Sequence, residues 1–396
     1  MRTPLCDDFG IDVPIFAFSH CRDVVAAVSN AGGMGVLGAL AFSPEQLEIE
    51  LAWIDEHVGD KPYGVDIVMP MQYEGKEAGL GQADARTGEV DPQAFAERIP
   101  AEVTDWIEGV LERYDVPPLP EGFQAAGGVG GADSAGLLGW TDGGARNQLE
   151  VALRHPVKLL VNALGPPPKD VIDLAHGRGI PVAALTGAVE HAVRQKEQGV
   201  DIVIAQGTEA GGHTGQIGSM VLIPDIVDAV APSPVLGAGG IGSGRQAAAA
   251  LALGAQGVWT GSIWLTVEES EMSGLVMEKL LAAGSKDAVR SRSLSGKPAR
   301  LLRTAWTDAW EHPDCPGTLP MPLQYMACAE ASQRISLAAR NPNSKARELV
   351  GMPVGQVVSR MNEVKKSSEV IYQFIDEFIE TVQRLDSLLE AAQERG

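Results

Sequence analysis

The chain has 396 residues, 45% of them hydrophobic and 21% charged, which is typical of a soluble globular protein with a large core. It carries 31 basic and 52 acidic residues, and a net charge of −21 argues against nucleic acid or an anionic membrane as a partner. The four cysteines lack metal-binding spacing, so no metal site is expected, and neither a signal core nor a spanning apolar run occurs. We therefore expect a cytoplasmic protein.

Short apolar runs alternate with segments of helical periodicity along the chain. Helices are predicted at Arg22–Ala31, Ser43–His57, Pro168–Arg178, Val189–Gln198 and Ser243–Leu253. The eight runs are Val13–Phe18, Gly35–Leu37, Tyr63–Met69, Lys158–Val161, Pro181–Leu185, Asp201–Ala205, Pro234–Ala238 and Gly257–Thr260. This pattern predicts an α/β fold, a TIM-type (β/α)₈ barrel built from residues 1–70 and 155–265. A doubly wound open sheet is the alternative.

Two regions break the alternation. Residues 71–154 form a long insertion after the third strand, with glycine-rich pieces at Gly75–Gly88 and Gly127–Gly131 around a helical piece at Phe95–Tyr114. We expect a lid or partner surface there, or a partly disordered decoration. Residues 266–396 are predicted to be a mostly helical extension that packs on the barrel. Its last helix, Ser367–Arg395, is amphipathic and could pack on the barrel or on a second subunit, so a homo-oligomer is possible.

The most informative motif is Ala205–Gly215, with sequence AQGTEAGGHTG, directly behind the predicted strand Asp201–Ala205. Its glycines allow positive φ or a close approach of the backbone to a ligand. One imidazole, that of His213, lies in the same loop. The pattern is suited to a site that combines a flat, phosphate-bearing cofactor with a proton-handling residue, although an ordinary turn with a surface histidine would look similar.

A second glycine cluster lies in Pro234–Arg245, with sequence PVLGAGGIGSGR, at the start of an alanine-rich helix. Amide groups at a helix start bind anions such as phosphate. Gly237–Gly242 also matches the Rossmann dinucleotide pattern, but the acid expected after the next strand is replaced by Thr260–Ser262. Two plain glycine turns would be the simpler explanation. The barrel phosphate site fits better, with FMN or a sugar phosphate near Gln206 and His213 and donors at Gly239, Gly240, Gly261 and Ser262.

These motifs, together with Leu253–Ser262 and Ala26–Gly35, resemble the nitronate monooxygenase family, formerly called 2-nitropropane dioxygenases, over about Pro14–Glu269 outside the insertion. The resemblance implies an FMN-containing barrel. It implies that the histidine at position 213 acts as catalytic base or positions the substrate anion. The cofactor contacts that it implies are Gln206, the backbone near Ala17 and Phe18, and the phosphate donors Gly239, Gly240, Gly261 and Ser262. The glycine pair Gly211 and Gly212 is also expected to bind the cofactor, because it allows a close approach of the backbone.

The chain departs from the family pattern near the expected flavin. Family members often have Gly-Val-Asn on the third strand, whereas this chain has Gly-Val-Asp ending in Asp66, so a carboxylate is predicted beside the cofactor. His20 follows the first strand and is either a second proton carrier or a helix cap. Asn162 follows the fourth strand and is either a substrate or flavin ligand or a turn residue. The stretch Phe18–Cys21 also replaces a smaller, glycine-rich family stretch. These departures, the insertion and the helical extension lie where substrate would enter or partners would dock, so they bear on the substrate more than on the cofactor.

The predicted function is an FMN-dependent oxidoreductase that oxidises a small carbon acid or nitronate with oxygen, giving a carbonyl compound and nitrite. Two alternatives are an NAD(P)H-dependent quinone or enoyl reductase and a dehydrogenase of a CoA-thioester or steroid-derived substrate. A third is a flavin-binding partner protein without turnover.

Overall fold

The computed structural model describes residues 1–69, 93–123 and 142–393. Its main feature is a closed barrel of parallel strands, in which the last strand pairs with the first through Phe16 and Trp259. The closure confirms the predicted barrel and excludes the open sheet. The strands in barrel order are β1 (Ile15–Ser19), β2 (Met34–Gly38), β3 (Tyr63–Asp66), β4 (Leu159–Asn162), β5 (Val182–Thr186), β6 (Ile202–Gln206), β8 (Val235–Ala238) and β9 (Gly257–Thr260).

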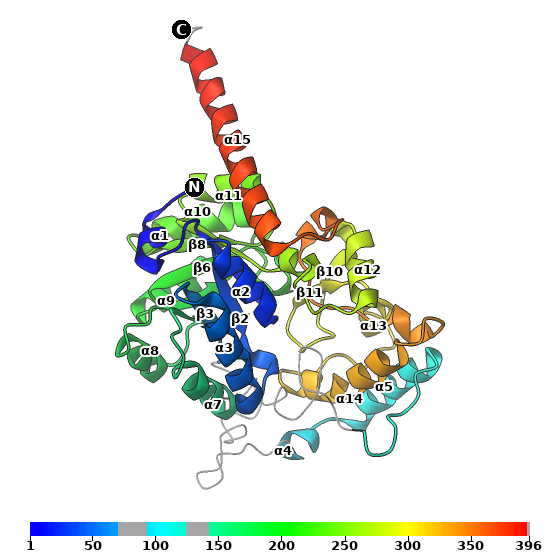
Figure 1. The fold of residues 1–396 in the computed structure, drawn as a ribbon. Helices are drawn as coiled ribbons and strands as arrows, with labels where there is room; N and C mark the ends of the chain where they lie inside the picture. The colour runs from blue at the N-terminus through cyan, green and yellow to red at the C-terminus, as the bar shows by residue number, and fades with distance from the viewer. Residues whose placement is uncertain (70–92, 124–141, 394–396) are drawn as a thin grey trace.

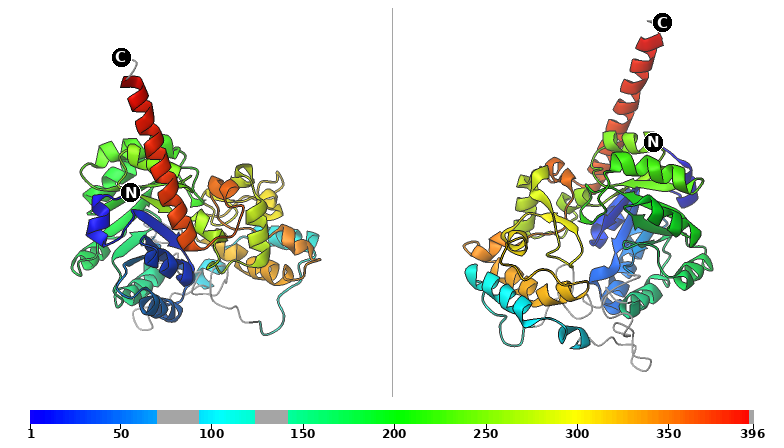
Figure 2. Two further views of the ribbon diagram at one scale, coloured as in Figure 1. Left: turned by 45° about the horizontal axis from the view of Figure 1, so that its top comes forward. Right: turned by 180° about the vertical axis from the view of Figure 1, so that it is seen from behind.

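Helices surround the barrel (Figures 1 and 2). Helix α3 begins at a side-chain cap: Ser43 and Gln46 form a capping box, and the Ser43 hydroxyl accepts from the Gln46 amide at 3.2 Å. These helices are α2 (Arg22–Asn30), α3 (Pro44–Val58), α7 (Asp142–Ala152), α8 (Lys169–His176), α9 (Val189–Glu197), α10 (Ser219–Val230) and α11 (Gly244–Ala252), and the short α1 (Pro4–Phe9) precedes β1.

Strand alternation decides which side chains fill the barrel and which face the helices. One buried cluster contains Phe16, Val36, Val161 and Ile204 and forms the barrel interior. Their neighbours Ala17, Val65, Leu160 and Val203 belong to the clusters under the helices. By the same alternation Phe18, Asp66 and Gln206 point inward at the carboxyl ends of their strands, where the active sites of such barrels lie.

A second lobe lies beside the barrel (Figures 1 and 2). Its core joins Ile107 and Leu111, which precede β4 in the chain, to Trp310 and Ile335 near the carboxyl end. Its helices are α4 (Gln93–Ala96), α5 (Ala101–Arg113), α12 (Gly274–Ala282), α13 (Ala305–Trp310) and α14 (Leu323–Ala338). A small antiparallel sheet of β10 (Ala288–Ser291), β11 (Ala299–Leu302) and β7 (Gly212–His213) connects this lobe to the loop after β6.

Side-chain packing shows which parts of the predicted ranges 71–154 and 266–396 contact the barrel. The division of the chain into domains at these ranges stays a proposal. Helix α7 lies in the range 71–154, yet its Ala145 and Leu149 pack with Leu47 and Leu51 of α3 on the barrel. The glycine-rich pieces at 75–88 and 127–131 lie outside the described residues. The last helix, α15 (Ser367–Gln393), leaves the body and projects beyond it (Figure 1). Among the described residues, no helix is long and apolar enough to cross a bilayer.

Candidate active site at the barrel mouth

The loops that follow β6 and β8 touch at two glycines. Gly239 and Gly240 have φ angles of 87° and 72°, which disfavour any residue with a side chain. A Cβ on Gly239 would lie 2.7 Å from the carbonyl oxygen of Gly207, and the Gly207 amide donates to Ala238 O at 2.9 Å. The predicted glycine turns therefore form one continuous structure at the carboxyl edge of the barrel.

This structure has the donors that a phosphate requires. Within the described chain, the amide N–H groups of Gly239, Gly240, Gly261 and Ser262 donate to no protein acceptor. The loop is held from behind by Gln246, whose side-chain oxygen accepts from the Gly242 amide at 2.9 Å and whose amide nitrogen donates to Gly240 O. A set of free amides beside the start of α11 suits the phosphate of a mononucleotide.

One carboxylate lies near the loop, and its charge is engaged elsewhere. Glu209 accepts from the amide and the hydroxyl of Ser219 at 3.1 Å, so it caps the first turn of α10. The residues present therefore fit FMN, whose phosphate would be held by Gly239, Gly240, Gly261 and Ser262.

We expect the substitution Gly239→Ala to abolish flavin retention. The methyl group would both oppose the positive φ and meet the Gly207 carbonyl, which costs on the order of 1–3 kcal/mol and moves the amides that hold the phosphate. Gly109→Ala in α5 is the matched control, because a Cβ there meets no atom within 4 Å. Flavin per chain after gel filtration is the measurement, and full occupancy of the Gly239 variant would contradict the assignment.

A carboxyl-terminal segment forms the wall of the loop after β6. The Gly355 amide donates to Ser262 Oγ at 2.8 Å, and the Gln356 amide donates to Glu209 O at 2.9 Å. A Cβ on Gly211 would lie 2.8 Å from the Gly355 nitrogen. Gly211, a predicted cofactor contact, is thus required because two chain segments pass each other here with no room for a side chain. Gly212 differs, because it has a φ of 76° and open space where its Cβ would lie.

His213 is held by the second lobe. Its strand β7 pairs with Ala299 of β11, and its Nε2 lies 2.6 Å from the hydroxyl of the fully buried Ser295. Burial, and secondarily the positive charge of Lys297, lowers the pKa of His213 to about 4. The imidazole is therefore neutral at pH 7 and is oriented by a fixed hydroxyl.

Sequence reasoning missed Ser295 and Lys297. They lie in the turn between β10 and β11, and the Lys297 amide donates to Ser295 Oγ at 3.4 Å. Lys297 pairs with no carboxylate among the described residues, and burial lowers the pKa of its ammonium. The signal that could have found them is the basic stretch Arg290–Arg303, which contains five basic residues and no acid in a strongly acidic chain.

The first strand brings an aromatic cluster to the mouth. Phe18 makes an edge contact with His20 at 5.0 Å between ring centroids and lies 6.0 Å from the ring of Trp259. Nδ1 of His20 lies 2.9 Å from Gly38 O, and burial lowers the pKa of this imidazole. Phe18 lies beside Gly261, because a Cβ added there would be 3.8 Å from its ring. His20 is thus fixed against β2, and a role as proton carrier stays a prediction.

Asp66 is buried at the carboxyl end of β3, with 2% of its surface exposed. Its Oδ1 accepts from the Ala163 amide at 3.0 Å, which favours the charged form, but burial outweighs this bond and raises the pKa to about 7. The predicted carboxyl group at the mouth therefore keeps its proton to a higher pH than an exposed aspartate does.

Asn162 and Ala17 face away from the barrel interior, because each lies one position from an inward residue. The side-chain oxygen of Asn162 accepts from the amides of Met69 and Leu164 at 3.0 and 3.4 Å, and its nitrogen donates to Met69 O at 3.2 Å. This geometry supports the turn role rather than a role as substrate ligand. Ala17 is fully buried under the helices, so only its backbone could face a flavin.

Comparisons with known proteins identify the family of the chain. The chain matches the family described as nitronate monooxygenase over residues 9–377. The chain belongs to the nitronate monooxygenase family. Rv1533 of Mycobacterium tuberculosis, described as a candidate monooxygenase, is 50% identical over 98% of this chain and 100% of its own length. As a member of the family, the chain is an oxidoreductase that uses a flavin.

Two further similarities concern other named activities. The (3aS,4S,5R,7aS)-5-hydroxy-7a-methyl-1-oxo-octahydro-1H-indene-4-carboxyl-CoA dehydrogenase of Rhodococcus jostii is 34% identical over 95% of this chain and 82% of its own length. The solved structure of nitroalkane oxidase from Streptomyces ansochromogenes has a TM-score of 0.73 at 24% identity, covers 96% of this chain and 99% of its own chain, and shows a shared fold. The family's barrel is thus common to proteins named for different substrates.

Proposed function

We propose that this family member binds FMN and oxidises a small nitro-bearing carbon acid, a nitroalkane, or its nitronate anion with oxygen, giving a carbonyl compound and nitrite. The observation that carries the proposal is the placement of a neutral, oriented His213 in the same loop system as four free amide donors. The flavin, when bound, would supply the redox chemistry, while the protein supplies binding, orientation and proton handling.

His213 would act as the base. A neutral imidazole can accept the proton that leaves the carbon acid, and the 2.6 Å contact between its Nε2 and Ser295 Oγ fixes the ring. With a pKa of about 4 in the free enzyme, His213 is not a cation at neutral pH and so does not by itself attract an anion. Lys297 would provide that attraction, since it is the positive charge that acts on His213.

A second candidate is a dehydrogenase of a CoA thioester. The Rhodococcus jostii dehydrogenase is 34% identical to this chain, whereas a Staphylococcus saprophyticus relative named for nitronate monooxygenase activity is 29% identical over 72% of it. Within the stretch Arg290–Arg303, Arg292 and Lys297 are exposed and would suit a phosphate-bearing substrate, whereas Arg300 is bonded to backbone carbonyls and Arg303 pairs with Asp308. The alternative activity of an NAD(P)H-dependent reductase stays a prediction, and so does the cytoplasmic location of the protein.

Anaerobic mixing separates these candidates. Purified protein is mixed in turn with propyl-2-nitronate, an acyl-CoA, NADH and NADPH, and bleaching of the flavin absorbance is followed. We expect the nitronate to bleach the flavin and oxygen to restore it with release of nitrite. Bleaching by the acyl-CoA or a pyridine nucleotide, with no response to the nitronate, would contradict the first proposal.

We expect Ser295→Ala to lower kcat/KM about tenfold, because one hydrogen bond of about 1.4 kcal/mol that orients the base is lost. Flavin content should not change. The control is Ser359→Ala, which removes an exposed hydroxyl bonded to Ser285 at 2.8 Å. A second readout is the pH profile: the apparent pKa of the base should move in the Ser295 variant alone. An unchanged rate and profile would show that Ser295 does not position His213.

A further inference from the structure

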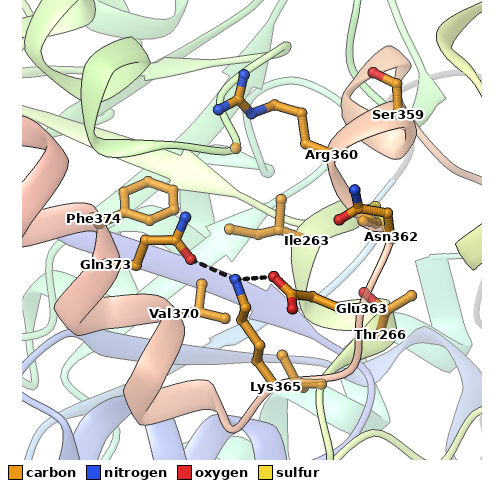
Figure 3. A pocket seen from close by; sticks show the side chains of 13 residues that line it. Ile263, Thr266, Ser359, Arg360, Asn362, Glu363, Lys365, Val370, Gln373 and Phe374 are labelled. Carbon is orange, nitrogen blue, oxygen red and sulfur yellow. Dashed lines mark hydrogen bonds and ion pairs between the residues drawn. The ribbon is translucent and has the colours of Figure 1, made fainter.

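The root of α15 is firmly attached to the body. Ile371 and Phe374 are buried, and Gly244 at the start of α11 leaves room for the Phe374 backbone where no side chain would fit. Lys365 joins the preceding loop to the helix, since its Nζ donates to Gln373 Oε1 at 2.9 Å and pairs with Glu363 at 2.5 Å (Figure 3). A pocket of about 330 Å³ lies beside these contacts.

The outer half of α15 has no cover. Every residue from 382 to 391 is exposed, and the helix extends away from both lobes in all three views (Figures 1 and 2). Several of the uncovered residues are nevertheless large and apolar: Val382, Leu385 and Leu389 are 46%, 45% and 64% exposed. A helical segment of this length is marginally stable in water by itself, so apolar burial against a partner would stabilise the outer half.

The apolar residues of this half continue the stripe that the body buries. Ile375, Phe378, Val382, Leu385 and Leu389 follow one another at steps of three, four, three and four residues. Such strict alternation is a 3.5-residue repeat, which forms the seam of a two-helix coiled coil. We call these five residues the α15 seam. The inner end of the seam borders the face of α15 that packs on the body of the same chain. The seam therefore continues the packing interface between α15 and that body.

The positions of the charges along α15 allow a second copy of the chain as the partner. The helix has six acidic residues and one basic residue, so two copies can pair only where the carboxylates avoid each other. Asp376, Glu380 and Glu390 lie away from the seam, and the flanking positions 379, 381, 386 and 388 are Ile, Thr, Asp and Leu. In a parallel pair of helices a residue on one flank faces the opposite flank of the other copy, so Asp386 would face Thr381 or Leu388 and no two carboxylates would meet. A membrane surface is disfavoured, because interfacial helices have Lys and Arg on their polar face.

We propose that two copies of this protein associate through the α15 seam. The arrangement would be a two-fold symmetric coiled coil in which Leu385 and Leu389 of each copy cover those of the other. The outer half of the helix would then be stabilised by the same apolar burial that fixes its root.

Light scattering after gel filtration of the flavin-loaded, full-length protein tests this. Wild type should approach twice the chain mass of 41.7 kDa as concentration rises. The variant Leu385→Glu with Leu389→Glu should remain at one chain mass. The control variant, Gln383→Glu with Ser387→Glu, adds the same two charges at the same spacing on the opposite face and should behave as wild type.

The flavin spectrum and helical circular dichroism show whether each variant is folded. Wild type at one chain mass over the whole concentration range would overturn the proposal, as would a folded seam variant that still has twice that mass. If circular dichroism shows that the seam variant has lost helix, the masses of the wild type and the control variant decide the test. None of these masses depends on the substrate, so the result is independent of the proposed function.

Discussion

Replacing His213 with Gln is expected to lower kcat/KM for a neutral nitroalkane by 10²–10⁴-fold, on the order typical for loss of a positioned base. Glutamine keeps a hydrogen-bonding group near Ser295 Oγ but cannot accept the proton. With a preformed nitronate no proton has to be removed, so the loss should be much smaller. Rates with both substrates, measured under the same conditions, separate the base role from a role in anion binding.

The pH dependence of kcat/KM gives a second test of the role proposed for His213. Because burial lowers the pKa of His213 to about 4, the wild-type kcat/KM for a nitroalkane should show no loss from this group between pH 6 and 8 and should fall as the pH approaches 4. The matched control is His191→Gln, which alters an exposed histidine of α9. Equal losses with both substrates, or wild-type rates in the His213 variant, would contradict the assigned role.

Replacing Asp66 with Asn is expected to stabilise the protein at pH 8 and not at pH 4. The folded-state pKa is raised to about 7, so the stability that the protonated side chain provides is present below its unfolded pKa of about 4 and is lost as the pH rises toward 7. Asparagine cannot ionise and keeps an oxygen to accept from the Ala163 amide. Three pKa units correspond to a gain of up to about 4 kcal/mol.

Urea denaturation at pH 4 and pH 8 measures this difference in the free energy of unfolding. Asp225→Asn is the control, because it removes the same formal charge from an exposed side chain of α10. A gain of equal size at both pH values would mean that ionisation of Asp66 is not its cause. A loss of stability at pH 8 would mean that the carboxylate has a compensating partner in the folded protein.

The barrel could be predicted from the sequence because its strands are buried on both faces. Runs such as Ile202–Ala205 are uniformly apolar and end at glycine or small polar residues, which marks both the strand and its carboxyl edge. The turn at Gly239 and Gly240 was predictable for the same local reason, and their role as phosphate donors stays a proposal. The side-chain direction of Asn162 could also have been read from alternation along β4, since Val161 points inward.

The second lobe could not be predicted in the same way. Strands β10 and β11 are four residues each and contain arginines, and β7 has only two residues, so none shows a strand pattern. The contact of Ile107 with the core around Trp310 depends on segments about 200 residues apart, which no local signal reports. Ser295 reaches His213 only through this pairing, and so the sequence did not reveal Ser295 as the partner of His213.

The most direct test of the central claim is the visible spectrum of the purified protein combined with the mass of the released cofactor. The account predicts the two absorption bands of an oxidised flavin, about one flavin per chain, and release of FMN. Colourless protein that takes up no added FMN, or release of FAD in its place, would contradict a mononucleotide phosphate bound by the amides of Gly239, Gly240, Gly261 and Ser262.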